Sequence, residues 1–336
     1  MAGRASRMDD NENEGHIPNE NCLRHAVCRF LYSDRESRAC PWHTCSAVSS
    51  PPTVRDRAVV HSELTINMAA SALVIEDVVK YFPVPQTGAR AFLNPFSPLT
   101  HPALLGVSFQ VEPVEVAALI GANGSGKSTL LRILATLLVP TRGRARVAGY
   151  DVERQGSHVR AQLGFHSATD GGFYDRLTAR QNLQFFAAMN NLFDTEASGR
   201  LEELTELMGM ATFIDSQVRT LSTGQVHRLG LARAMIHRPS VLLLDEPTRS
   251  LDPMAAADFR RFLKTQLVER HGTTILFASH TLAEVEQLAD RVVLLDRGKM
   301  LACDSPRGLR AATRAATLET ALERLTPPGF LAEVSS

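Results

Sequence analysis

Residues 121–128 read Gly121-Ala122-Asn123-Gly124-Ser125-Gly126-Lys127-Ser128. This stretch fits the phosphate-loop pattern, in which two glycines separated by four residues are followed by Lys and Ser. An apolar run at residues 116–120 predicts a buried strand before the loop, and leucines at helical spacing predict a helix after it that stops at Pro140. A loop between a strand and a helix indicates a nucleotide site rather than a chance run of glycines.

The composition of this loop indicates how it would hold a nucleotide. A glycine loop that opens into a helix directs backbone N–H groups and the positive end of the helix dipole towards phosphate. We expect Lys127 to reach the β- and γ-phosphates and Ser128 to bind Mg²⁺, which prefers oxygen ligands. The predicted nucleotide-binding residues of the loop are Gly121, Ala122, Asn123, Gly124, Ser125, Gly126, Lys127, Ser128 and Thr129.

Two adjacent acids follow a second apolar strand. Residues 241–244 form a continuous apolar run, typical of a strand covered on both faces, and the run ends in Asp245 and Glu246. The carboxyl ends of such strands are where α/β sheets bind ligands. We expect the two side chains on alternating faces, with Asp245 in the Mg²⁺ shell and Glu246 polarising water. The alternative is a pair of solvated turn residues.

Further site candidates follow along the chain. Residues 273–278 predict a buried strand that delivers His280 to the same sheet edge, where it would contact phosphate, the alternative being a structural histidine. Ser222 is suited to cap the next helix, with Gly224 and Gln225 in its first turn. Phe82 lies upstream of the loop, and it either stacks on adenine or fills the core.

The remaining pattern predicts an α/β fold. We expect a phosphate-loop NTPase sheet with helices on both faces, an antiparallel β subdomain on the N-terminal side, and an inserted all-helical subdomain at about residues 173–220. Residues 105–111 are expected to pair as a hairpin arm with the strand that enters the loop. Capping boxes are expected at Thr178 with Gln181 and at Thr281 with Glu284.

Composition limits the class of protein. The 336 residues carry 36 basic and 36 acidic side chains, so no global charge attracts nucleic acid, and we expect no nucleic-acid partner. The sequence contains no apolar run of the ~20 residues that span a bilayer and no apolar stretch typical of a signal peptide. We therefore expect a cytoplasmic protein.

Residues 1–67 differ from the rest of the chain. They are polar and lack sustained periodicity, so we expect them to be disordered, or untranslated if translation begins at Met68. Zinc binding is a further alternative, but the cysteine spacing is looser than in structural zinc sites. The candidate ligands are Cys22, His25, Cys28, Cys40, His43 and Cys45. The predicted domains are therefore residues 1–67, an ATP-binding domain at 68–305, and a short helical tail at 306–336.

The motifs GANGSGKS, LSTGQ and VLLLDEP, followed by Ser250-Leu251-Asp252 and Ala278-Ser279-His280, occur in that order. Together they resemble the ATP-binding subunit of an ABC transporter over residues 73–326. The resemblance implies that Glu246 is the catalytic base, Asp245 the metal-side acid and His280 a switch histidine. It also implies that Phe82 stacks on adenine, with Tyr81 as its alternative, and that residues 221–225 form the signature loop.

The resemblance also implies partners. Members of this family close as dimers around two Mg-ATP, with a dimer-contact loop that here ends at Asp252, and drive a separate membrane permease. They are therefore peripheral on the inner face of the cell membrane. Gly164-Phe165, residues 174–178 and Leu318-Glu319 are similar to the sodium-extrusion and drug-export branch.

Two positions depart from the family pattern. Ala168 stands where most members carry a glutamine, which leaves Thr169 or Asp170 as substitutes, and Val114 replaces a glycine before Glu115. Other functions compatible with the motifs are a non-transport ATPase of repair or translation and a nucleotide sensor with weak turnover. The repair and translation members typically have a long coiled-coil insertion or a second phosphate loop, and neither is present in this sequence.

Overall fold

The computed structural model describes residues 71–84, 99–167, 172–249 and 251–326. The predictions for residues 1–67, for Ala168 and its substitutes, and for Ser250 lie outside these ranges. None of the helices within them is long and apolar enough to cross a membrane.

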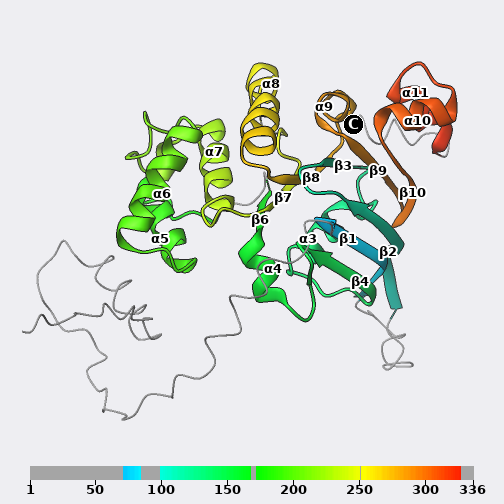
Figure 1. Cartoon of the computed structure of the whole chain (residues 1–336), viewed down its shortest axis with the longest axis horizontal. Helices are drawn as coiled ribbons and strands as arrows, with labels where there is room; N and C mark the ends of the chain where they lie inside the picture. Colours follow the sequence, from blue (N-terminus) through cyan, green and yellow to red (C-terminus); the bar gives the residue numbers. More distant parts are fainter. Residues whose placement is uncertain (1–70, 85–98, 168–171, 250, 327–336) are drawn as a thin grey trace, which may run out of the picture. The chain divides into compact units, whose positions relative to one another are not determined.

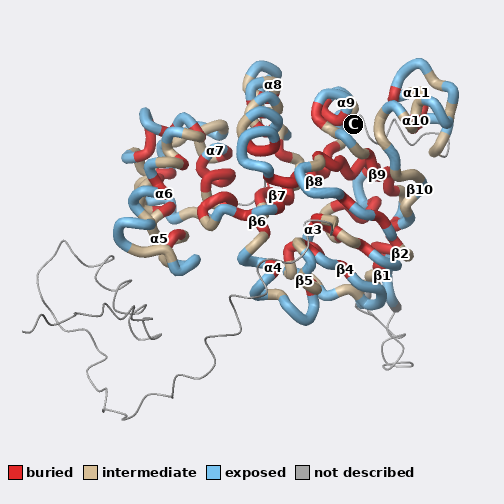
Figure 2. The backbone as a smooth tube through the Cα atoms, in the orientation of Figure 1, coloured by how far each residue is buried: buried red, intermediate tan, exposed pale blue. Residues whose placement is uncertain are grey.

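The larger sheet carries the phosphate loop. Its strand order is β10-β9-β3-β8-β7-β6, and all neighbours pair in parallel except β10 with β9. Every residue of β3 and β8 is buried, as the continuous apolar runs predict, and Figure 2 shows the same concentration of burial in the central strands. The strands are β3 (Val116–Ile120), β6 (Leu163–Ser167), β7 (Val241–Asp245), β8 (Thr274–Ser279), β9 (Arg291–Asp296) and β10 (Lys299–Asp304).

A second, antiparallel sheet has the order β2-β1-β4-β5. It consists of β1 (Leu73–Val84), β2 (Leu99–Val111), β4 (Arg142–Val147) and β5 (Tyr150–Asp151). The expected hairpin between residues 105–111 and the strand entering the loop is wrong, because β2 pairs with β1 along its length while β3 pairs with β8 and β9. The two sheets meet where the N–H of Leu105 donates to the carbonyl of Gly298 at 2.8 Å.

Helix α3 (Lys127–Leu134) packs between the two sheets, as Figure 1 shows. Leu130, Leu131 and Leu134 are buried in the core that both sheets share. The helix ends six residues before Pro140, earlier than predicted. Leu137 is 61% exposed, so the leucines after the helix do not extend its apolar stripe.

A layer of helices packs on the other face of the larger sheet and forms a second core with it. It comprises α5 (Ala179–Met189), α6 (Asp194–Leu207), η1 (Val218–Thr220) and α7 (Thr223–Ala234), which lie together on the left of Figure 1. The predicted capping box at Thr178 is present, with both reciprocal hydrogen bonds to Gln181. Of these helices, α5, α6 and η1 lie within the inserted all-helical region predicted at about residues 173–220, and α7 begins after it.

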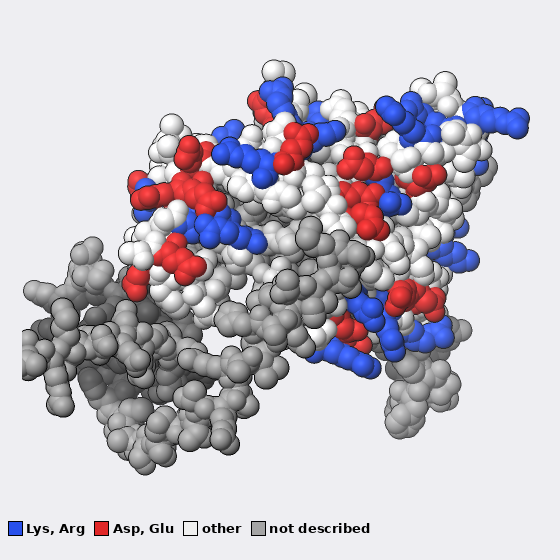
Figure 3. Space-filling view, viewed as in Figure 1, with Lys and Arg blue, Asp and Glu red and all other residues white. Residues whose placement is uncertain are grey.

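Charged side chains connect α6 to the segment that follows α7. Arg200 of α6 is buried and donates through Nε to the Ile236 carbonyl at 3.0 Å, and it pairs with Glu203 at 2.8 Å. Glu203 also pairs with Arg238 at 2.8 Å, so this one carboxylate bridges the buried guanidinium of Arg200 and the exposed guanidinium of Arg238. In Figure 3, acidic and basic side chains lie next to one another over these helices.

The remaining helices divide between the two cores. Helix α4 (Gly156–Gln162) contributes Val159 to the core that contains α3. Buried side chains of the other helices belong to the core of the helical layer; these helices are α8 (Pro253–Phe262), which continues as the π-helix η2 (Leu263–Arg270), α9 (Leu282–Leu288), α10 (Pro306–Thr313) and α11 (Leu318–Leu325). The expected capping box at Thr281 is wrong, because the Thr281 side chain makes no capping hydrogen bond.

Val114→Gly is expected to raise the free energy of unfolding by about 1 kcal/mol. Val114 has a φ of 64°, in the left-handed region that a β-branched side chain rarely adopts and that glycine adopts without steric cost. Its side chain is 46% exposed, so the substitution removes little buried area. Urea unfolding would measure the difference.

The matched control is Val139→Gly, at a similarly exposed valine that is not among the residues with positive φ. This change is expected to lower stability by roughly 0.5–1 kcal/mol, because only the entropic cost of glycine remains. A Val114→Gly chain no more stable than this control would contradict the account of strain at Val114.

Candidate functional site

The phosphate loop places Lys127 in a buried position at the end of β3. Lys127 is 6% exposed, and its Nζ donates to the carbonyls of Gly121 at 2.5 Å and Ala122 at 3.0 Å. Burial lowers the pKa of Lys127, while the nearby charges of Glu246 and Asp245 act to raise it. Burial disfavours the charged form of this ammonium group. A bound phosphate would place negative charge beside it and so favour the charged form.

Two features of the loop fit a phosphate ligand. The Ser125 hydroxyl is buried and has no hydrogen-bond partner among the described residues. Gly121 is required by packing, since a Cβ there would lie 2.3 Å from both the Leu295 carbonyl and Ser125 Oγ. A loop that requires glycine at position 121 and has an unpaired buried hydroxyl is suited to accept an oxyanion.

Ser128 and Asp245 come together across 117 residues of sequence. Ser128 Oγ donates to Asp245 Oδ1 at 3.2 Å, which joins the first turn of α3 to the end of β7. Burial raises the pKa of Asp245, and the bond from Ser128 acts against that shift. The two neighbouring oxygen donors fit the ligand preference of Mg²⁺, and a divalent cation would supply the positive charge that favours an ionised Asp245.

Glu246 lies between two basic groups. Its Oε1 is 3.4 Å from His280 Nδ1, and its Oε2 is 3.1 Å from Arg249 Nη1. The backbone of Glu246 has a φ of 51°, and its N–H donates to the Ala278 carbonyl at 3.0 Å. Asp245 thus contacts the phosphate-loop helix while Glu246 contacts the end of β8, and the sharp turn at Glu246 separates the two acids.

Arg249 is a residue of this site that the sequence analysis did not identify. A turn closed by the Arg249 N–H on the Glu246 carbonyl, at 3.2 Å, returns its side chain to the acid. The Pro-Thr sequence after Glu246 was the available signal, since proline favours such turns.

The signature turn is present at the start of α7. Ser222 Oγ accepts from the Gln225 N–H at 3.3 Å, and Gln225 Oε1 accepts from the Ser222 N–H at 2.9 Å. This capping box confirms the predicted helix start. The N–H groups of Thr223 and Gly224 remain at the helix terminus, where the dipole favours an anion.

The last two predicted nucleotide contacts lie outside this cluster. Asp252 Oδ1 caps α8 by accepting from the N–H groups of Met254 and Ala255, both at 3.0 Å. Phe82 is half-buried near the end of β1, outside both core clusters, and Lys80 Nζ lies 5.3 Å from its ring centre. The structure therefore disfavours the core-filling alternative for Phe82 and describes no contact between it and the loop.

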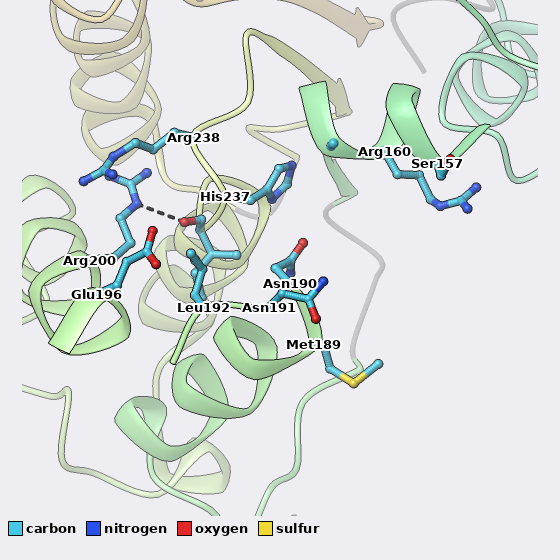
Figure 4. A pocket seen from close by; sticks show the side chains of 12 residues that line it. Ser157, Arg160, Met189, Asn190, Asn191, Leu192, Glu196, Arg200, His237 and Arg238 are labelled. Atoms are coloured by element: carbon cyan, nitrogen blue, oxygen red, sulfur yellow. Dashed lines mark hydrogen bonds between the residues drawn. The ribbon is translucent and has the colours of Figure 1, made fainter. Parts of the chain in front are cut away.

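A separate hollow of about 580 Å³ lies between α4, the α5–α6 junction and the end of α7. Figure 4 shows Arg200 and Glu196 on one side of it and Arg160 on the other. Its walls contain none of the predicted nucleotide-binding residues. The hollow and the predicted nucleotide-binding residues are therefore separate features of the described chain.

The fold and the site together define a phosphate-loop NTPase. The glycine loop follows β3, the acids follow β7 and the histidine follows β8, so the chemistry gathers at the carboxyl ends of neighbouring parallel strands. A capped turn at the start of a separate helical layer completes the set of motifs.

Comparisons with known proteins identify the family. Residues 104–249 match the ABC transporter family model. The chain is 38% identical to the ABC transporter ATP-binding protein NatA of Bacillus subtilis over 59% of this chain and 80% of that protein. It is also 38% identical to the daunorubicin resistance ATP-binding protein DrrA3 of Streptomyces coeruleorubidus, over 63% of this chain and 66% of that protein. The chain belongs to the ABC transporter ATP-binding proteins, and its reaction is ATP hydrolysis.

Solved structures agree with this assignment. An ATP-binding subunit of an ABC transporter superposes with a TM-score of 0.63 at 26% identity, over 76% of this chain and 100% of that one. The cbiO1 protein of Clostridium perfringens, part of a transporter complex, gives a TM-score of 0.61 at 25% identity, over 76% of this chain and 93% of that one.

Proposed function

We propose that two copies of this chain close around two Mg-ATP, with Ser222 and Gly224 of one copy facing the γ-phosphate held by Lys127 of the other. The observation that carries the proposal is the placement of the two motifs. Helix α7 packs on β6 and α5, whereas α3 packs on β2, β4 and β7. A second copy would supply the anion that the α7 terminus favours. A structural neighbour solved as a dimer bound to ADP and Pi has the same fold, which supports this arrangement.

In this proposal each side chain has one role. Lys127 and the loop N–H groups bind the phosphates, and Ser128 with Asp245 hold Mg²⁺. A bound Mg²⁺ would supply positive charge that stabilises the negatively charged phosphate groups. Glu246 accepts the proton of the attacking water, and His280, 3.4 Å away, orients its carboxylate.

The work of hydrolysis would drive a separate membrane permease. Export is the proposed direction, and docking on the permease would place the chain on the inner face of the cell membrane. Relatives named for daunorubicin resistance and bacitracin transport support a role in drug transport. In this arrangement residues 68–305 form the ATPase domain, residues 306–336 are an appended tail, and Phe82 and Asp252 contact the nucleotide.

Gly224→Asp is expected to prevent dimer formation in the presence of Mg-ATP and to reduce turnover about 10²-fold or more, because a carboxylate would face the partner's γ-phosphate. A side chain fits this position in the single chain, since a Cβ there meets nothing within 4 Å. Light scattering with Mg-ATP, in chains that also carry Glu246→Gln so that ATP persists, measures the dimer.

Gly199→Asp is the matched control, because it adds the same charge at an exposed helical glycine whose Cβ would also meet nothing within 4 Å. It should leave both dimer formation and turnover unchanged. A chain that stays monomeric at saturating Mg-ATP, or a Gly224→Asp chain that dimerises and turns over normally, would rule out the two-site dimer.

A further inference from the structure

Glu284 is an acid buried behind the catalytic loops. It is 1% exposed and lies in the first turn of α9, four residues after His280. The sequence analysis expected it to cap the helix with Thr281, and the structure gives it a different contact. Val285 and Leu288 of the same helix are also buried, so Glu284 lies beside the face of α9 that packs on the core.

The contacts of Glu284 fix the turn that carries His280. Ser279 Oγ donates to Glu284 Oε2 at 2.5 Å, and the Thr281 N–H donates to the same Ser279 Oγ at 3.0 Å. His280 is therefore flanked on both sides by residues that Glu284 holds through one hydroxyl.

The second carboxyl oxygen of Glu284 has no hydrogen-bond partner within the described ranges. Glu284 Oε1 is buried and accepts no hydrogen bond among the described residues. Burial raises the pKa of Glu284, and the hydrogen bond from the Ser279 hydroxyl acts against that rise, as do the charges of Arg260 and His280. The bond from Ser279 is therefore the contact through which this acid acts on the turn of His280.

We propose that Glu284 is a positioning residue, which holds the turn of His280 through the Ser279 hydroxyl and so sets the distance between His280 and the general base. The segments that carry His280 and Glu246 already share one backbone bond, from the Glu246 N–H to the Ala278 carbonyl at 3.0 Å. Glu284 adds a side-chain hydrogen bond on the His280 side, so the turn that carries His280 is held by the backbone of β8 and by a buried carboxyl group. The inference rests on the roles proposed above for Glu246 and His280.

Glu284→Ala is expected to lower kcat about tenfold at saturating ATP, because small displacements of catalytic groups cost up to roughly 10²-fold. The Kd for ATP should stay within about twofold, since Glu284 does not contact the phosphate loop. Glu284→Gln should keep kcat within about threefold, because the amide oxygen can still accept the hydrogen bond from Ser279. Glu286→Ala, at an exposed acid on the same helix, is the control and should match the unaltered chain.

Two further variants separate positioning from a merely structural role. In a His280→Ala background, Glu284→Ala should cost less than about twofold, because the two changes remove the same contact. Ser279→Ala removes the same hydrogen bond with a smaller change and should lower kcat about three- to tenfold, which keeps the test available if Glu284→Ala does not fold.

The outcomes are distinguishable from failure of the proposed function. An active Glu246→Gln chain would overturn the role of the base itself. If Glu246→Gln is inactive, the inference about Glu284 is overturned by normal kcat in both Glu284→Ala and Ser279→Ala, by equal losses in Glu284→Gln and Glu284→Ala, or by a full loss in the His280→Ala background.

Discussion

Lys127→Ala is expected to weaken ATP binding and to reduce hydrolysis at least about 10²-fold, the usual effect of removing one preorganised group at a transition-state oxyanion. Lys127 is a buried point charge at the phosphate loop, and the sequence contains only three other lysines, at positions 80, 264 and 299. Alanine would also leave the carbonyls of Gly121 and Ala122 without their donor, which disturbs the loop that remains.

A fluorescent-nucleotide titration and a phosphate-release assay measure the two effects. Lys264→Ala is the matched control, since Lys264 is exposed on η2 and is not one of the predicted site residues. It should bind and hydrolyse ATP as the unaltered chain does. Unchanged affinity and rate in Lys127→Ala would remove the phosphate loop from the mechanism.

The sequence was sufficient to predict those parts of the fold that depend on local patterns. The apolar runs at β3, β7 and β8 predicted buried strands, and the capping box at Thr178 and the N-cap at Ser222 predicted two helix starts. These signals involve residues close in sequence, so they do not depend on how distant segments pair.

The errors arose where pairing or packing between distant segments decides the structure. The partner of β2 is β1, and nothing in the alternation of residues 105–111 distinguishes β1 from β3 as its neighbour. At α3, Leu137 continues the leucine spacing, but the helix ends first and Thr136 adopts a φ of 59°. Spacing alone does not reveal which leucines reach the core.

The same distinction applies to the candidate site: residues within motifs were predicted, and residues outside motifs were not. The motifs identified Ser128, Asp245, Glu246 and His280, and the structure brings Ser128 to Asp245 and His280 to Glu246. Arg249 and Glu284 carry no motif, because their contacts depend on a turn and on the burial of one helix face. The sequence of α9 did contain a signal for the burial of Glu284. This acid directly precedes Val285 and lies three residues before Gln287 and four before Leu288, which places it on the border of the apolar stripe.

Glu246→Gln is expected to lower ATP turnover by about 10²–10⁴-fold, the usual contribution of general base catalysis, while ATP binding is retained. Glutamine matches the shape of the acid but cannot accept the proton of water. It also removes the carboxylate charge next to Arg249 and His280. Because Glu246 is 18% exposed and Arg249 is 58% exposed, water screens the ion pair between Glu246 and Arg249, and its loss contributes little. The loss should therefore appear in kcat and not in the Kd for ATP.

Phosphate release under single-turnover conditions separates hydrolysis from product release. Glu269→Gln, an exposed acid on η2, is the control for loss of one negative charge and should hydrolyse ATP normally. Arg249→Gln tests the neighbour, and its effect should stay below about fivefold, because an exposed ion pair contributes less than ~1 kcal/mol. If Glu246→Gln lost no more activity than Arg249→Gln, the proton would have to leave through another group, and His280, which lies 3.4 Å from the acid, would be the group to substitute next.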